Sequence, residues 1–119
     1  MKLKVIFLVA TCGFTSSAWA KFIENTDITS YVNQLIKKQK VVFIPAGTYK
    51  VDANKSIIPK DGSEIRLTPQ TKLTVIPNKN GSYRIFQIKN VENVNISGGS
   101  LIGDKYTHLG NTGEWGMGI

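Results

Sequence analysis

The sequence predicts an all-β solenoid that is preceded by one short helix. Three apolar runs, at residues 41–52, 65–76 and 86–97, align so that four rows of apolar residues are separated by 24 and then by 21 positions. Repeats of roughly 20–25 residues built from short strands are typical of solenoids, in which each unit buries its inner face against the next one. The four rows are Val41/Ile65/Phe86, Phe43/Leu67/Ile88, Tyr49/Leu73/Val94 and Val51/Val75/Ile96.

Residues 1–20 have the features of a secretory signal peptide. Lys2 and Lys4 give a basic start, and an apolar stretch follows at residues 5–10. Ala18 and Ala20 then form the small-x-small pattern that a signal peptidase recognises. We therefore expect cleavage after Ala20 and a secreted or periplasmic protein. No transmembrane segment is expected, because a polar run at 15–17 ends the apolar region too early.

Cys12 is the only cysteine of the chain, and it lies inside this leader. A lipid-anchored protein with Cys12 as its new N-terminus is an alternative, but Thr11 stands where lipoprotein signals usually carry Gly or Ala. After cleavage at Ala20 the chain has no thiol, which excludes disulfides, thiolate metal sites and cysteine nucleophiles.

The charge of the chain after the leader is positive. Residues 21–119 hold 13 basic and 8 acidic residues, a net charge of about +5. This charge suits an anionic partner such as an acidic polysaccharide, and we expect no nucleic-acid partner. In the alternative interpretation the lysines are simply solvated, with Lys37, Lys38 and Lys40 complementing the C-terminal end of a helix. The sequence does not predict an oligomeric state.

Region 21–40 is predicted to hold an amphipathic capping helix over residues 28–39. Asp27 is the expected N-cap, because its carboxylate can accept from the first free backbone amides. We expect the helix to cover the first solenoid unit, whose strand edges would otherwise recruit other chains. The apolar residues that fall on one face at helical spacing are Ile28, Val32, Leu35 and Ile36.

Region 41–119 is predicted to hold the solenoid strands. Pro45-Ala46-Gly47 bends the chain after the first strand, and alternation resumes at 48–51. Asp61-Gly62 and Asn80-Gly81 are strong turn pairs. These turn pairs also suit simple hairpins, so a small complete β-sandwich-like protein remains an alternative.

Residues 104–114 are polar, contain two glycines and are predicted to form a protruding loop. Residues 115–119 then resemble the opening strand of a further unit. A solenoid normally closes with a capping unit that has a polar outer end. Since none follows, we expect about three coils and a C-terminally incomplete fragment.

Residues 41–49, Val-Val-Phe-Ile-Pro-Ala-Gly-Thr-Tyr, resemble the opening of the pectate-lyase and polygalacturonase superfamily, where a Pro-x-Gly-x-Tyr turn follows a hydrophobic strand. Residues 91–104 are similar to the coil of that group with an Asn-Val-x-Ile-x-Gly-Gly signature. The resemblance implies a right-handed parallel β-helix and hydrolysis or β-elimination of an acidic polysaccharide. It also implies calcium only for a full-length lyase. The superfamily includes non-catalytic adhesins and tailspikes, so a carbohydrate-binding module is the alternative.

No residue matches the catalytic motifs of that superfamily, so we expect this chain to be inactive alone. Asp104 and Glu114 bracket the predicted loop and could converge as the carboxylate pair of a glycosidase. His108, the sole histidine, could shuttle protons. The plain alternative for all three is a solvated loop side chain. No metal site is predicted, because zinc needs three or four ligands.

Tyr106 and Trp115 are the predicted sugar-contacting aromatic residues, with His108 as a further candidate. An aromatic ring can stack on the apolar C–H face of a sugar. Trp115 could equally pack against the strands.

Overall fold

The structure, a computed structural model, describes residues 22–111 and 115–119. These residues form one helix, α2 (Thr29–Lys38), and short strands of three to five residues. The strands are β1 (Val41–Ile44), β2 (Gly47–Val51), β3 (Glu64–Leu67), β4 (Thr71–Val75), β5 (Ser82–Arg84), β6 (Asn95–Ser97), β7 (Ser100–Ile102) and β8 (Trp115–Met117). The predicted leader lies outside the described residues.

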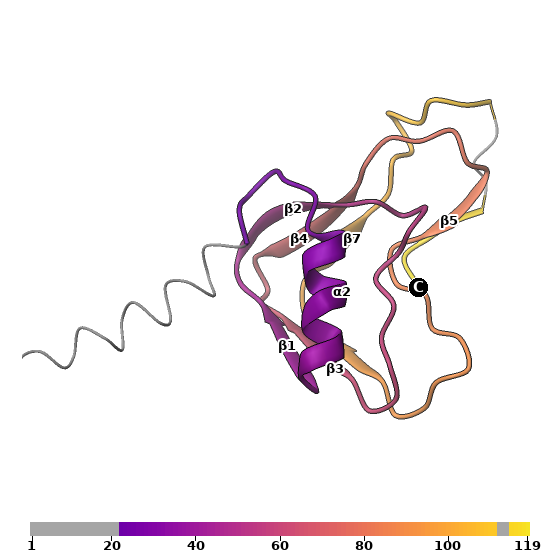
Figure 1. Cartoon of the computed structure of the whole chain (residues 1–119). Helices are drawn as coiled ribbons and strands as arrows, with labels where there is room; N and C mark the ends of the chain where they lie inside the picture. Colours follow the sequence, from indigo (N-terminus) through magenta and orange to yellow (C-terminus); the bar gives the residue numbers. More distant parts are fainter. Residues whose placement is uncertain (1–21, 112–114) are drawn as a thin grey trace, which may run out of the picture.

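The strands form three small parallel sheets (Figure 1). Two sheets have three strands, in the orders β1-β3-β6 and β2-β4-β7, and the third pairs β5 with β8. Each strand therefore pairs with a segment that lies more than twenty residues away in the sequence, as when Val41 pairs with Glu64.

The expectation of a right-handed parallel β-helix with about three coils is wrong. The described residues form a small domain with one helix and short parallel strand pairs in three small sheets. The uniform repeat is also absent, because the spacing between paired residues differs from pair to pair. Val41 pairs with Glu64, 23 residues further on, and Glu64 pairs with Asn95, 31 residues further on.

The alignment of the apolar runs failed at its first rows because apolar side chains lie on both faces of β1. Val41 and Phe43 are 40% and 44% exposed, while Val42 and Ile44 are fully buried. Val42, and not Val41, pairs with Ile65. The rows in β2 and β4 were predicted correctly: their observed pairs are Tyr49 with Leu73 and Val51 with Val75.

The third run, residues 86–97, is not one unit. Phe86 bridges to Ile57, whereas Ile96 pairs with Ile65 in another sheet. The segment between Phe86 and Ile96 has no regular strand pairing. The alignment assigned the two residues to one repeat unit only because both are hydrophobic.

The core lies between the sheets and the inner face of α2. Each fully buried Leu or Ile side chain stabilises the fold by roughly 1.5–3 kcal/mol relative to leaving it exposed. The buried helix residues pack with the inward residues of β1 to β5, and the core is Ile28, Val32, Ile36, Val42, Ile44, Tyr49, Val51, Ala53, Ile57, Ile65, Leu67, Leu73, Val75, Tyr83, Ile85 and Phe86.

The helix begins one residue later than predicted, at Thr29, and ends at Lys38. The N-cap is Ile28 and not the predicted Asp27. Asp27 still contacts the first helical residue, because its Oδ1 accepts from the Thr29 amide at 2.9 Å and from the Thr29 hydroxyl at 2.6 Å. Asp27 also bridges to Lys50 of β2 in parallel.

Asn33 attaches the helix to the chain near Ile57. Its amide nitrogen donates to the Ser56 carbonyl at 3.0 Å, and its amide oxygen accepts from the Ile58 amide at 2.8 Å. The side chain thus pairs with the backbone as a neighbouring strand would.

Two glycines make the close turn between β6 and β7. Gly98 and Gly99 have φ values of 79° and 72°, which favour glycine. A Cβ on Gly98 would lie 2.0 Å from the carbonyl oxygen of Leu67. This turn sets the start of β7, which leads into the loop described next.

Candidate functional site

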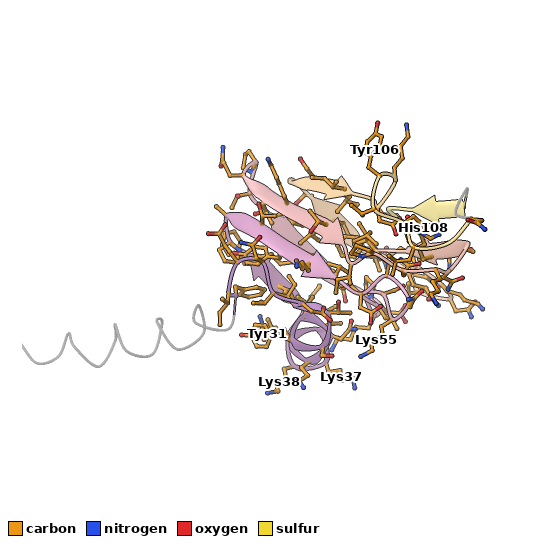
Figure 2. The ribbon with its side chains drawn as sticks, turned by 90° about the horizontal axis from the view of Figure 1, so that it is seen from above. Tyr31, Lys37, Lys38, Lys55, Tyr106 and His108 are labelled. Carbon is orange, nitrogen blue, oxygen red and sulfur yellow. The ribbon has the colours of Figure 1, made fainter. Side chains whose placement is uncertain are left out.

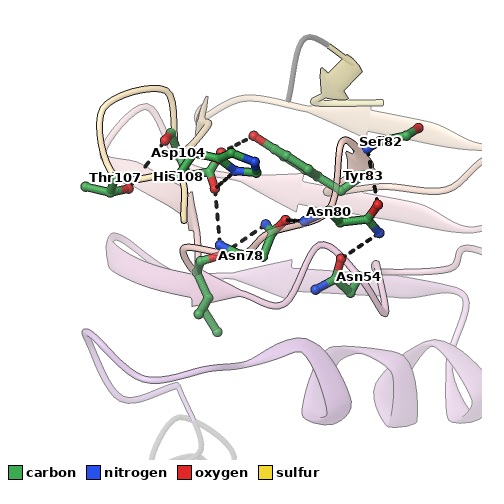
Figure 3. A network of polar contacts seen from close by, with 9 residues as sticks. Asn54, Asn78, Asn80, Ser82, Tyr83, Asp104, Thr107 and His108 are labelled. Atoms are coloured by element: carbon green, nitrogen blue, oxygen red, sulfur yellow. Dashed lines mark hydrogen bonds and ion pairs between the residues drawn. The ribbon is translucent and has the colours of Figure 1, made fainter. Parts of the chain in front are cut away.

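The loop that follows β7 is fastened to the domain through Asp104, whose residue exposure is 3% (Figure 3). Its Oδ1 accepts a hydrogen bond from the Tyr83 hydroxyl of β5. Its Oδ2 accepts from the Asn78 backbone amide at 3.3 Å and lies 2.9 Å from Nδ1 of His108. We call these four residues, Asp104, Tyr83, Asn78 and His108, the Asp104 cluster.

The charges of the Asp104 cluster favour an ionised carboxylate. Burial alone would raise the pKa of Asp104, but the hydrogen bonds from Tyr83, His108 and Asn78, together with the charge of His108, lower it overall. For Tyr83, burial raises the pKa of the phenol, and its hydrogen bond to Asp104 raises it further. The phenol therefore remains the donor and the carboxylate the acceptor.

His108 is neither the exposed loop residue nor the accessible proton shuttle that the sequence allowed. Its side chain is 11% exposed, and its ring lies 25° from the plane of Tyr83 at a centroid distance of 6.2 Å. Nε2 is buried and has no hydrogen-bond partner among the described residues. A general base must reach a substrate proton within about 3 Å, so in this conformation the imidazole acts as part of the loop anchor.

The tip of the loop carries two side chains that face the solvent. Tyr106 is 89% exposed and points away from the sheets (Figure 2). The ammonium of Lys105 lies 5.2 Å from the centroid of the Tyr106 ring. A cation and an exposed aromatic face are thereby held side by side on a loop whose base is buried.

Glu114, the predicted partner of Asp104, lies outside the described residues. Asp104 itself is buried and already has three contacts, so it is not a solvated loop acid. Trp115 begins β8, whose backbone pairs Trp115 with Ser82. The side chain of Trp115 lies outside the description.

Sequence reasoning missed Tyr83 and Asn78. Asn78 lies just before the Asn80-Gly81 turn pair, where we singled out no buried residue, and it is 8% exposed. The asparagine residues close to one another in this part of the chain are a signal that could have indicated a network of side-chain hydrogen bonds. Asn80 donates through its side chain to Oδ1 of Asn54 at 3.0 Å, and its backbone amide donates to Oδ1 of Asn78 at 2.8 Å.

Hollows also lie elsewhere on the surface of the described residues. A groove of about 250 Å³ runs between α2 and β1, and its lining is Phe22, Tyr31, Leu35, Gln39, Val41, Phe43 and Pro45. A hollow of about 440 Å³ is lined by Arg84, Gln87, Ile88, Lys89 and Ile119. Within residues 22–111 and 115–119, no group of three or more His, Cys, Asp or Glu side chains could hold a metal ion. The one helix in this part of the chain is too short to span a membrane.

The chain is similar to two proteins of Bacillus subtilis (strain 168). It is 34% identical over 116 residues to "Uncharacterized protein YclG", an alignment that covers 79% of this chain and 20% of YclG. It is 33% identical over 98 residues to "SPbeta prophage-derived uncharacterized protein YorA", covering 66% of this chain and 17% of YorA. No family model and no solved structure matches the chain. The chain thus spans about a fifth of the length of the curated relatives that it matches.

Proposed function

We propose that this chain is the part of a secreted or periplasmic protein that binds an acidic polysaccharide through the loop that Asp104 anchors. The observation that carries the proposal is the pair formed by Lys105 and Tyr106. Tyr106 is 89% exposed, and the ammonium of Lys105 lies 5.2 Å from the centroid of its ring.

This pair has the two groups that a uronate sugar requires. The flat face of Tyr106 suits the apolar C–H face of a sugar ring, and the ammonium of Lys105 suits the carboxylate. A positively charged chain also attracts an anionic polymer at long range. Because Asp104 is buried beneath the loop, the pair is presented on a fixed base, which reduces the ordering cost of binding.

Hydrolysis or β-elimination of that polysaccharide is proposed for the whole protein only. Both reactions need an acid or base that reaches the substrate. In the described loop Asp104 and His108 contact each other, and Nε2 of His108 is buried. We therefore expect this chain alone to bind without turnover.

Binding is tested by isothermal titration calorimetry of the chain with polygalacturonate, with neutral dextran as the control ligand. We expect polygalacturonate to bind and dextran not to bind. We expect Tyr106→Ala to bind about tenfold more weakly, because it loses about 1.4 kcal/mol of binding free energy from burial of the ring. The matched control is Leu109→Ala, at a 61% exposed position in the same loop. Equal affinities for the Tyr106 and Leu109 variants would overturn the role of the loop.

A non-catalytic binding module of a phage or cell surface is the second candidate. It is supported by the prophage origin of YorA and by the burial of Nε2 of His108. Incubating a full-length relative with polygalacturonate separates the two candidates. New reducing ends or unsaturated products favour the enzyme, and binding without product favours the module.

A further inference from the structure

We propose that the outer face of the β2-β4-β7 sheet is a second contact surface for the same polyanion, with Lys50 and Lys72 as its cations. This inference rests on the proposed function and extends the binding site from the loop to the sheet. We call this surface the lysine face.

The register of the strands places both lysines on one side of the sheet. Tyr49 and Leu73 pair with each other and are buried, so the residues that flank them in β2 and β4 point outward. Thr48 pairs with Lys72. The outward residues of the lysine face are Thr48, Lys50, Lys72, Thr74, Ser100 and Ile102.

The two lysines are neighbours on this face. Lys50 pairs with Thr74, so Lys72 lies one strand over and two residues back. With strands about 4.8 Å apart and two residues rising about 6.6 Å, their Cα atoms are about 8 Å apart. Two lysine side chains that start from Cα atoms at this spacing can reach neighbouring carboxylates of one polymer.

Within the described residues, neither Lys50 nor Lys72 forms an ion pair with a carboxylate. The ion pairs of residues 22–111 and 115–119 join Arg66 to Glu64 and His108 to Asp104. Both Lys50 and Lys72 are exposed. Two acids lie beside this sheet and are engaged elsewhere. Oε1 of Glu24 accepts from the Thr48 amide at 3.1 Å. Asp27 bridges to Lys50 through the backbone, and its Oδ1 accepts from the amide and the hydroxyl of Thr29.

The neighbouring sheet provides an internal comparison. On the outer face of β1-β3-β6 the one cation, Arg66, contacts Glu64 at 2.5 Å, so its charge is balanced. The residues beside them on β1, Val41 and Phe43, are apolar. An excess of positive charge is thus a property of the lysine face and not of strand surfaces in general.

The lysine face is also continuous with the proposed loop site. Strand β7 forms one side of the face and ends at Ile102. Asp104 follows and is buried, and Lys105 and Tyr106 come directly after it. Thr48 and Ser100 add hydroxyl groups beside the lysines, whereas the Thr74 hydroxyl donates to the Tyr49 carbonyl at 3.1 Å. A polymer held by the loop can therefore continue over hydroxyls and ammonium groups, which suits a chain that carries both hydroxyls and carboxylates.

The test is the salt dependence of polygalacturonate binding by the double variant Lys50→Gln/Lys72→Gln. The matched control is Lys37→Gln/Lys38→Gln, which removes the same charge from α2, on the side of the sheets away from Tyr106 (Figure 2). At 50 mM salt we expect the first variant to bind roughly tenfold more weakly. Its plot of log affinity against log salt should be shallower, because fewer counterions are released.

The outcomes separate this inference from the proposed function. If both double variants bind equally while Tyr106→Ala binds weakly, the lysine face is wrong and the loop site stands. If the unaltered chain does not bind polygalacturonate, both are wrong. Circular dichroism of each variant checks that the fold is retained.

Discussion

Nδ1 of His108 lies 2.9 Å from Oδ2 of Asp104, four residues earlier in the chain, and both side chains are nearly excluded from solvent. This contact joins His108, within the loop, to Asp104 at the start of the loop. The other oxygen of the same carboxylate accepts from Tyr83, on a separate strand. One carboxylate therefore joins the loop to itself and to the domain.

Replacing Asp104 with Asn is expected to destabilise the fold strongly. The change removes the charge and one acceptor, and it leaves buried donors of Tyr83, Asn78 or His108 without partners. Such losses cost about 2–4 kcal/mol. Urea unfolding followed by circular dichroism measures the difference.

Asp61→Asn is the matched control for that substitution. Asp61 accepts one hydrogen bond, from the Glu92 amide at 2.8 Å, and is exposed. We expect a cost of at most about 1 kcal/mol there. A similar loss of stability in the two variants would contradict the anchoring role of Asp104.

The pKa shifts predict that the Asp104 cluster stabilises the fold less at low pH and at high pH. The lowered pKa of Asp104 contributes stability that is present above its unfolded value of about 3.9 and is lost as the pH falls through the folded value. The raised pKa of Tyr83 contributes stability that is present below about pH 10 and is lost as the pH rises through the folded value.

Two measurements check these limits. The stability difference between the unaltered chain and Asp104→Asn should shrink below about pH 4. In a spectrophotometric titration of phenolate, Tyr83→Phe should remove a group that ionises above about pH 10. A stability difference that stays constant down to pH 2 would contradict the role of the Asp104 charge. If Tyr83→Phe instead removed a phenol that ionises below about pH 10, the role of Tyr83 would be contradicted.

Gly98→Ala is expected to disrupt the turn between β6 and β7. The backbone there has φ 79°, and an added Cβ would lie 2.0 Å from the Leu67 carbonyl oxygen. Strain and displacement together cost at least about 2 kcal/mol. Gly103→Ala is the control, because its nearest neighbour would be the Tyr83 hydroxyl at 3.8 Å. Thermal unfolding of the two variants should differ clearly, and equal midpoints would show that the turn can relax.

Asn33→Ala is expected to loosen the helix. The change leaves the Ser56 carbonyl and the Ile58 amide without the partners that Asn33 supplies, at a cost of about 1–2 kcal/mol. Hydrogen exchange of the Ile58 amide should accelerate. In the control Gln34→Ala, at an exposed position of the same helix, that amide should keep its protection.

The local elements could be predicted from the sequence, whereas the pairing between strands largely could not. Helix α2 was found because Ile28, Val32 and Ile36 repeat at helical spacing and are all buried. The four residues of β1 are all apolar, so hydrophobicity alone does not tell Val42 from Val41. The assumed repeat therefore placed the β1 and β3 pairs one residue out of register, although the pairs between β2 and β4 were correct.

The candidate site was predicted only in its position along the chain. Polarity and glycine content predicted the loop, and Tyr106 was singled out as a candidate for sugar contact, which stays a prediction. The anchor was missed because Tyr83 and Asn78 reach Asp104 from 21 and 26 residues earlier. Contacts at that separation follow from strand pairing, which the composition of the loop does not reveal.

The parallel sheets also determine how this chain must fold. Val41 pairs with Glu64, and Ser82 pairs with Trp115, 33 residues further on. A chain of such non-local pairs cannot gain contact energy until a long loop has closed, and proteins of this kind fold in milliseconds to seconds instead of microseconds. Helix α2 is made of local contacts and can form first, so its apolar face is exposed until the strands assemble against it.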